Sequence, residues 1–194
     1  MKKLIYTILA LLLMSALASS VRAADKPAAK PPKTGDKVID FTLRDLRKQK
    51  VVTATARKNK VFLLKFGATW CGWCNKQAPD FNAVVKAYDK KVFVLDVDIN
   101  EKPAVVKAHN KKLRTKYLTV LDSAGAVAET YGVSGIPVVI IADKEGTIVY
   151  RGYYTPFDKL KKVIDALVEK DKEEEEKEKK GGEAKKAAPY GEDF

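Results

Sequence analysis

The sequence predicts an α/β domain in which a central mixed β-sheet is covered by helices on both faces. Hydrophobic residues make up 46% of the 194-residue chain and charged residues 32%, a composition that supports one packed core. Between Val38 and Val168, short apolar runs typical of buried strands alternate with segments of helical periodicity, which favours parallel strands joined by helices. Two neighbouring apolar runs near the end are separated by a short turn with Gly146, which indicates a hairpin and therefore an antiparallel part of the sheet.

The first half of the domain is expected to begin with a small hairpin, in which residues 38–43 pair with Val51 and Val52. Residues 61–66 follow as a continuous apolar run, which is typical of a strand buried on both faces. The pattern then changes to helical spacing over residues 75–88, where apolar side chains recur on one face. These side chains are Phe81, Val84, Val85 and Tyr88.

The second half repeats this alternation. A second buried strand is predicted at residues 92–97, followed by a helix at residues 103–113, where Pro103 is tolerated in the first turn. Residues 119–121 are expected to be extended, and residues 126–131 to form a short helix that ends at Gly132. The closing hairpin pairs residues 138–142 with residues 147–151.

The last predicted element is an amphipathic helix over residues 157–168, and a charged low-complexity tail follows it at residues 169–194. The tail contains seven lysines and ten acidic residues, which give it a net charge of −3. Several Glu–Lys pairs four positions apart within residues 172–180 favour a solvated extension of the helix, which Gly181 and Gly182 would stop. The alternative, which the sequence leaves open, is a disordered tail.

The first 23 residues have the parts of a secretory signal peptide. Lys2 and Lys3 precede an apolar run over residues 4–18, and small residues lead to an expected cleavage site after Ala23. The run is shorter than the roughly 20 residues that span a membrane comfortably, although an uncleaved membrane anchor is the alternative. Residues 24–37 are rich in Pro, Ala and Lys and are expected to form a linker to the domain at residues 38–168. We therefore expect an exported protein, located in the periplasm.

The chain is basic, with 37 Lys and Arg residues against 25 Asp and Glu residues and a formal net charge of +12. A basic exported domain could attract acidic partners or an anionic membrane, but a lysine-coated soluble surface explains the charge more simply. Nucleic acid is not an expected partner, because the lysines are not interleaved with aromatic residues. A monomer is expected.

The chemistry of the chain is concentrated in its only two cysteines, Cys71 and Cys74. Two cysteines exclude a disulfide-rich scaffold and a four-cysteine zinc site, and Asn75 stands where a haem-attachment motif needs histidine. The pair follows a predicted strand where a helix begins, so the helix N-terminus should lower the pKa of the Cys71 thiol. Cys74, one turn into the helix, would resolve a mixed disulfide. The spacing therefore predicts thiol–disulfide exchange without a cofactor or metal.

Residues 65–74, KFGATWCGWC, resemble the active-site strand and turn of thioredoxin-fold proteins, and ATWC looks most like the exported TlpA/ResA-like branch. Residues 131–137, YGVSGIP, resemble the loop that holds the cis-proline of this family. Pro79 matches a kinking helix proline, and residues 143–148 match the closing hairpin. The resemblance implies a thioredoxin-like fold with a cis Ile136–Pro137 bond that faces Cys71.

It also implies the residues of the site. Cys71 and Cys74 are the expected catalytic pair. The expected substrate-binding residues are Trp70, Gly72, Trp73, Ile136 and Pro137.

The sequence departs from the family pattern at several positions. Lys65 stands where thioredoxins have a buried acid, and a charged lysine cannot accept a proton from Cys74. We expect Lys65 to extend to solvent, the alternative being that its charge lowers the pKa of a cysteine. Gly67 replaces a large aromatic residue, and Trp73 replaces the usual proline and would offer an apolar surface to a substrate. The histidine that strongly oxidising DsbA proteins carry between their cysteines is missing, which favours a reductant or an isomerase.

The sequence thus predicts an exported thiol–disulfide oxidoreductase with protein thiols and disulfides as substrates, recharged by a membrane-bound redox partner. One alternative is a copper-transfer module that uses the cysteines and His109, although His109 is expected to be a surface residue. Another is a redox-inert interaction domain. A peroxiredoxin is not expected, because only Thr69 falls near its motif positions before the cysteine. No chemistry is assigned to the strand-end and turn aspartates, which are Asp96, Asp98, Asp122 and Asp143.

Overall fold

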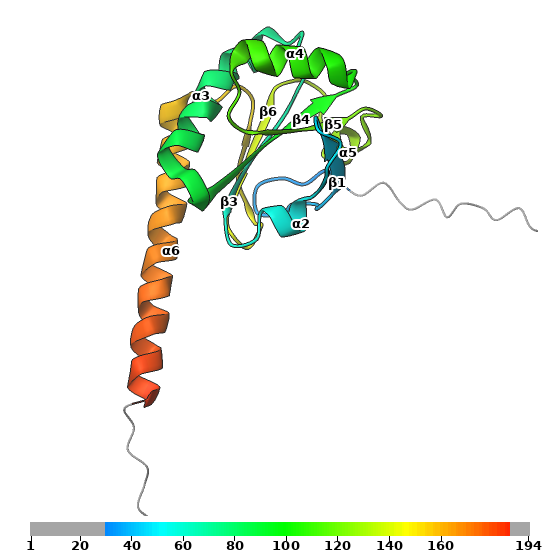
Figure 1. Cartoon of the computed structure of the whole chain (residues 1–194). Coiled ribbons are helices and arrows are strands. Elements are labelled where there is room, and N and C mark those ends of the chain that lie inside the picture. The colour runs from blue at the N-terminus through cyan, green and yellow to red at the C-terminus, as the bar shows by residue number, and fades with distance from the viewer. Residues whose placement is uncertain (1–29, 187–194) are drawn as a thin grey trace, which may run out of the picture.

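A seven-stranded mixed sheet in the order β2-β1-β5-β4-β3-β6-β7 forms the centre of the structure, a computed structural model that describes residues 30–186 (Figure 1). β3 pairs in parallel with β4, and β4 with β5, whereas the remaining pairs are antiparallel. The mixed sheet predicted from the sequence is therefore confirmed. The strands are β1 (Thr42–Asp45), β2 (Lys50–Val52), β3 (Val61–Gly67), β4 (Val92–Ile99), β5 (Leu118–Asp122), β6 (Val138–Ala142) and β7 (Ile148–Gly152).

Helices cover both faces of the sheet, as predicted. They are α2 (Thr53–Ala56), α3 (Gly72–Tyr88), α4 (Pro103–Leu113), α5 (Ala126–Thr130) and α6 (Phe157–Lys186), with a 3-10 turn η1 (Asp89–Lys91). Successive side chains of a strand point to opposite faces, so β3 serves two cores. Val61 and Leu63 pack with residues of α3 and α6 in one core, and Phe62 and Phe66 pack on the α5 side in the other. The short helix α2 was not predicted.

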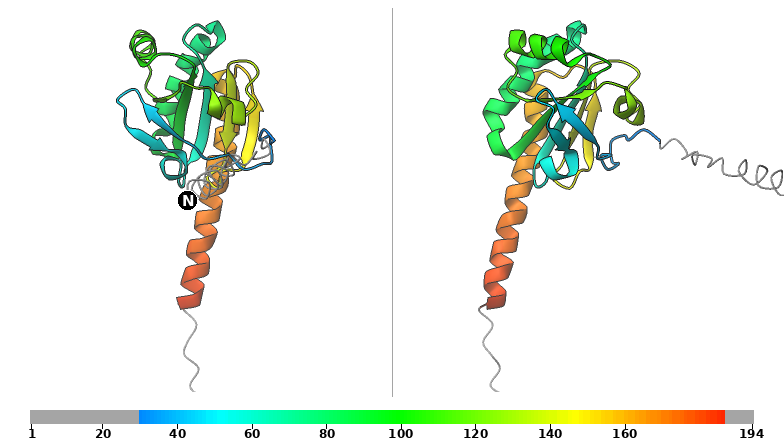
Figure 2. Two further views of the ribbon diagram at one scale, coloured as in Figure 1. Left: turned by 90° about the vertical axis from the view of Figure 1, so that its right-hand side faces the viewer. Right: turned by 45° about the vertical axis from the view of Figure 1, so that its right-hand side comes forward.

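Helix α6 extends far beyond the sheet (Figures 1 and 2). The expected stop at Gly181 and Gly182 is wrong, because the helix continues through both to Lys186. A glycine costs a helix only about 1 kcal/mol relative to alanine, which weakens the helix without ending it. An ion pair of 3.2 Å between Lys144 Nζ and Asp171 Oδ1 joins the closing hairpin to α6 at the start of this extension.

The segment before β1 is attached to the domain. The backbone nitrogens of Gly35 and Val38 donate to the carbonyl oxygens of Ile148 and Gly146, each at 2.8 Å. Contacts with the fold therefore begin before Val38, where the sequence predicts the domain to start. The expected signal peptide at residues 1–23, with residues 24–29 of the expected linker, lies outside the described residues. Within residues 30–186, no helix is both long and apolar enough to cross a membrane.

Candidate active site

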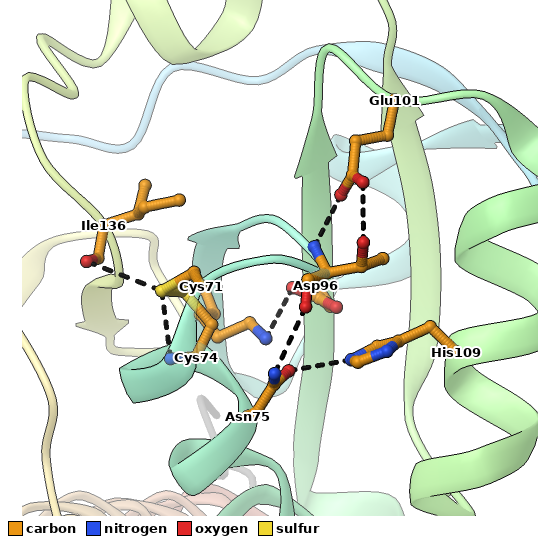
Figure 3. The surroundings of a disulfide bond; sticks show 9 residues. Cys71, Cys74, Asn75, Asp96, Glu101, His109 and Ile136 are labelled. Carbon is orange, nitrogen blue, oxygen red and sulfur yellow. Dashed lines mark hydrogen bonds and ion pairs between the residues drawn. A yellow bond between two sulfur atoms is a disulfide. The ribbon is translucent and has the colours of Figure 1, made fainter.

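The two cysteines lie at the start of α3, directly after the turn that follows β3. Cys71 is the N-cap residue of the helix, and its Sγ accepts a hydrogen bond of 3.1 Å from the backbone nitrogen of Cys74. The two residues form a disulfide, with their Cα atoms 5.2 Å apart (Figure 3). The unpaired N–H groups and the dipole of a 17-residue helix point at Cys71, the arrangement that stabilises a thiolate once the disulfide opens.

The loop before β6 faces this disulfide. Its Ile136–Pro137 peptide bond is cis, which confirms the expectation from the family resemblance. The carbonyl oxygen of Ile136 lies 3.7 Å from Cys71 Sγ (Figure 3). A cavity of about 430 Å³ lies beside this contact, lined by Trp70, Ile136, Val133, Ala128 and others. The structure thus brings Cys71, Cys74, Ile136 and Pro137 together as predicted, and leaves room next to them.

Aromatic side chains surround the disulfide on the surface. Trp70 is 74% exposed and Trp73 57% exposed, and the Trp73 ring lies 5.3 Å from the ring of Tyr154. Lys76 Nζ lies 4.8 Å from the Trp73 ring centre and 5.2 Å from that of Tyr154. Gly72 has open space where a side chain would begin. Both tryptophans are therefore placed to touch a substrate, and their role in binding one stays a prediction.

Lys65 does not extend to solvent as expected. It is 5% exposed, and its Nζ lies 3.1 Å from Oδ1 of Asp96, the residue opposite it in the register of β3 and β4. The contact is an ion pair without hydrogen-bond alignment, since Asp96 Oδ1 has no hydrogen-bond partner within the described part of the chain. The expectation is wrong because β3 is a central strand buried on both faces, which leaves the lysine no path outward.

The lysine lies close to the disulfide instead. A Cβ atom on Gly67 would sit 3.2 Å from Cys74 Sγ and 3.3 Å from Lys65 Cε, so sulfur and lysine flank the same glycine. The second hypothesis for Lys65, a charge that acts on a cysteine, therefore has the geometry that it requires.

Two acidic residues beside the cysteines were missed by sequence reasoning. Asp98 is 4% exposed, and burial raises its pKa to about 8, with the negative charges of Glu101 and Asp96 adding to the effect. Glu101 accepts hydrogen bonds from the backbone nitrogen of Thr69 at 2.5 Å and from its hydroxyl at 2.6 Å, next to the cysteine turn (Figure 3). A signal for Asp98 exists in the sequence: Asp96 and Asp98 interrupt an apolar strand two positions apart, so both must face the same side.

His109 is half-buried and held in place, which differs from the expected surface position. Its Nε2 lies 2.7 Å from Oδ1 of Asn75, whose amide nitrogen donates to the carbonyl oxygen of Thr69 at 3.1 Å. Among the described residues, no group of three or more His, Cys, Asp and Glu side chains is arranged to hold a metal ion.

A cysteine pair at a helix start, facing a cis-proline loop on a mixed sheet of this order, defines the thioredoxin-like class of thiol–disulfide oxidoreductases. The chain belongs to the AhpC/TSA family, whose model matches residues 34–151.

Relatives and solved structures agree with this assignment. The chain is 30% identical over 116 residues to thiol-disulfide oxidoreductase ResA of Bacillus thuringiensis subsp. konkukian, a match that spans 59% of this chain and 66% of the relative. The ResA of Geobacillus thermodenitrificans is 28% identical over 166 residues, which cover 85% of this chain and 88% of that one. A crystal structure described as a thiol:disulfide interchange protein DsbE from Chlorobium tepidum has a TM-score of 0.64 and 27% identity, covering 70% of this chain and 97% of that one.

Proposed function

We propose that the protein is an exported thiol–disulfide oxidoreductase that reduces or isomerises disulfides of protein substrates. The observation that carries this proposal is the Cys71–Cys74 pair at the N-terminus of α3, facing Ile136 of the cis-proline loop. The names of the ResA and DsbE relatives support the chemistry, and the signal-peptide pattern of residues 1–23 supports the export. The protein works as a monomer without a cofactor or metal, and residues 1–23 are the export signal.

In the reductive direction, the Cys71 thiolate attacks one sulfur of a substrate disulfide and forms a mixed disulfide. Cys74 then attacks the Cys71 sulfur, which releases the second substrate sulfur and leaves the enzyme oxidised. Two electrons pass to the substrate, so a membrane-bound redox partner must return two electrons to the Cys71–Cys74 disulfide. Trp70, Gly72, Trp73, Ile136 and Pro137 bind the substrate around the reacting sulfur.

The reductive or isomerising direction is supported by the residues between the cysteines. Gly72 and Trp73 are the two residues between the cysteines, where strongly oxidising DsbA proteins carry a histidine. A histidine cation there would stabilise the Cys71 thiolate and make the reduced form more stable. Its absence favours a disulfide that forms readily, which is the property of a reductant.

The reduction potential of the pair tests this direction. Trp70 and Trp73 flank the cysteines and are the only tryptophans of the chain, so their emission should report the redox state. The protein is equilibrated in dithiothreitol and glutathione buffers, with a Cys71→Ser variant as the silent control. A potential near or below the thioredoxin value of about −270 mV is expected, and one near the DsbA value of about −120 mV would make the protein a disulfide donor.

A further inference from the structure

We infer that Asp98 is the residue that exchanges the proton of Cys74: it receives that proton when Cys74 attacks a mixed disulfide and returns it when the Cys71–Cys74 disulfide opens. The inference rests on the proposed function, because it concerns a step of the same exchange. Asp98 exchanges this proton across a small cavity that lies between its carboxyl group and Cys74. It therefore positions and carries the proton of Cys74.

The sheet brings the two groups to the same place. Alternate residues of β3 and β4 point toward α3, and Lys65, Asp96 and Asp98 occupy these positions in register. Cys74 approaches from the first turn of α3. Between them lies a narrow cavity of about 10 Å³, lined by both Cys74 and Asp98, and this volume is on the order of what one water molecule requires. A single water can therefore connect the carboxyl group to the sulfur.

Asp98 has an oxygen available for this task. Its Oδ1 is buried and has no hydrogen-bond partner among residues 30–186, whereas the carboxyl group shares a hydrogen bond with Glu101. Burial and the charges of Glu101 and Asp96 raise its pKa to about 8, against an opposing effect of Lys65. An unperturbed thiol has a pKa of about 8.5 and an unperturbed aspartate one of about 3.9, so the raised pKa makes Asp98 a better match for a thiol proton than an ordinary carboxylate.

The other titratable groups that face the cavity are less suitable. Lys65 of β3 is a cation without an acceptor, and its ion pair occupies Asp96 of β4. His109 of α4 uses Nε2 as a donor to the Asn75 oxygen, because the Asn75 amide nitrogen is already a donor to Thr69. Tyr117, before β5, has a pKa raised well above its ordinary range by burial.

Glu101, which follows β4, accepts two hydrogen bonds from Thr69. It thereby connects Asp98 to the turn that carries the cysteines. Asp98 is left as the acid with a free oxygen beside Cys74.

The step is balanced in atoms and electrons. In the mixed disulfide, the Cys74 thiol gives its proton to the Asp98 carboxylate through the water, and its sulfur electron pair forms the bond to Cys71 Sγ. The bond between Cys71 and the substrate sulfur breaks, and the substrate leaves as a thiolate. When a substrate thiolate opens the enzyme disulfide, Cys74 leaves as a thiolate and takes the proton from Asp98.

The test measures the rate at which Cys74 closes the disulfide. The reduced protein is mixed with saturating oxidised glutathione from pH 6 to pH 10, and tryptophan emission follows the closure. In the wild type, the rate should rise through about pH 8 as Asp98 ionises. In Asp98→Asn the rate at pH 7 should fall about a hundredfold, and its rise should move to the higher pH at which Cys74 ionises unaided.

Asp45→Asn is the matched control. Asp45 is also a buried aspartate, but its carboxylate accepts hydrogen bonds from the backbone nitrogens of Arg47 and Gln49 in the β1–β2 turn. This variant should keep the wild-type rate and pH profile even if it is less stable.

A folded Asp98→Asn protein with the wild-type rate and pH profile overturns the inference, while glutathione exchange by the wild type leaves the proposed function intact. If Asp98→Asn does not fold, carboxyl ¹³C NMR of the wild type decides. An Asp98 signal that titrates near pH 8 in the oxidised protein and shifts its midpoint on reduction supports the inference, and one that titrates near its ordinary value of about 4 in both states overturns it.

Discussion

The ion pair between Lys65 and Asp96 makes a sharp prediction about stability, because both partners are buried. Removing one partner of a buried pair leaves an uncompensated charge, which costs about 3–5 kcal/mol, whereas an apolar pair of similar size is often neutral. Lys65→Met and Asp96→Val should therefore each lower the free energy of unfolding by about 3 kcal/mol or more. The double variant should lie within about 1–2 kcal/mol of the wild type.

Urea unfolding of the oxidised proteins at pH 7 measures all four members of this cycle. The chain offers an internal comparison in Lys161 and Asp165 on α6, an ion pair four residues apart with both side chains substantially exposed. That pair should contribute only about 0.3–0.5 kcal/mol. The coupling energy between Lys65 and Asp96 should exceed about 2 kcal/mol. A single variant that fails to fold while the double variant folds would also show a strong coupling between the two residues. A coupling no larger than that of the surface pair would refute the reasoning.

Three further predictions concern the same site. Gly67→Ala should destabilise the oxidised protein by about 1–2 kcal/mol in thermal unfolding, because its Cβ would lie 3.2 Å from Cys74 Sγ. Gly72→Ala is the control, since its Cβ meets open space and the substitution should be neutral or stabilising. Equal effects of the two substitutions would contradict the packing argument. The folded pKa of Asp98, about 8, exceeds its unfolded value, so the folded state binds more protons than the unfolded state between about pH 4 and 8. The contribution of Asp98 to the free energy of unfolding should therefore fall as the pH rises from about 5 to 8, by at most about 1.4 kcal/mol per pH unit. Asp98→Asn should flatten this slope, and an unchanged slope would exclude the raised pKa. Trp73→Ala should slow reduction of a disulfide-bonded protein several-fold while exchange with glutathione stays near wild type, and equal losses for both substrates would argue against a substrate-binding role.

The strands and helices could be predicted from the sequence because each has a local signature. β6 was placed at the bounds the structure shows, since an apolar run of five residues bounded by Pro137 and Asp143 specifies a buried strand. The end of α6 could not be predicted in this way. Two adjacent glycines resemble a stop signal, but a helix ends only when another conformation is more stable, and glycine alone does not provide one.

The buried charges were harder to interpret because their partners come from another strand. A lysine in a buried strand is expected to extend to solvent when no partner for its charge is known, and the sequence alone does not identify the neighbour of Lys65 across the sheet. Once β3 and β4 pair in parallel, Asp96 lies opposite it and neutralises its charge. Asp98 lies one pleat further along, opposite Gly67, where the missing side chain leaves Cys74 next to the same face.

The arrangement of Lys65, Asp96 and Asp98 has one physical consequence for the proton of Cys74. A thioredoxin-like site with a buried acid on β3 has a proton acceptor for the second cysteine on that strand, and a lysine at that position cannot fill the role. In this chain the lysine is paired with Asp96, and an acid remains available on β4, where Asp98 lines the cavity beside Cys74. The charge of Lys65 also opposes the rise of the Asp98 pKa, which keeps that pKa near 8 and thus close to that of a thiol. Lys65→Met should therefore raise the pKa of Asp98 further and shift the pH profile of Cys74 closure upward, whereas a profile that stays in place would show that the lysine and the proton carrier act independently.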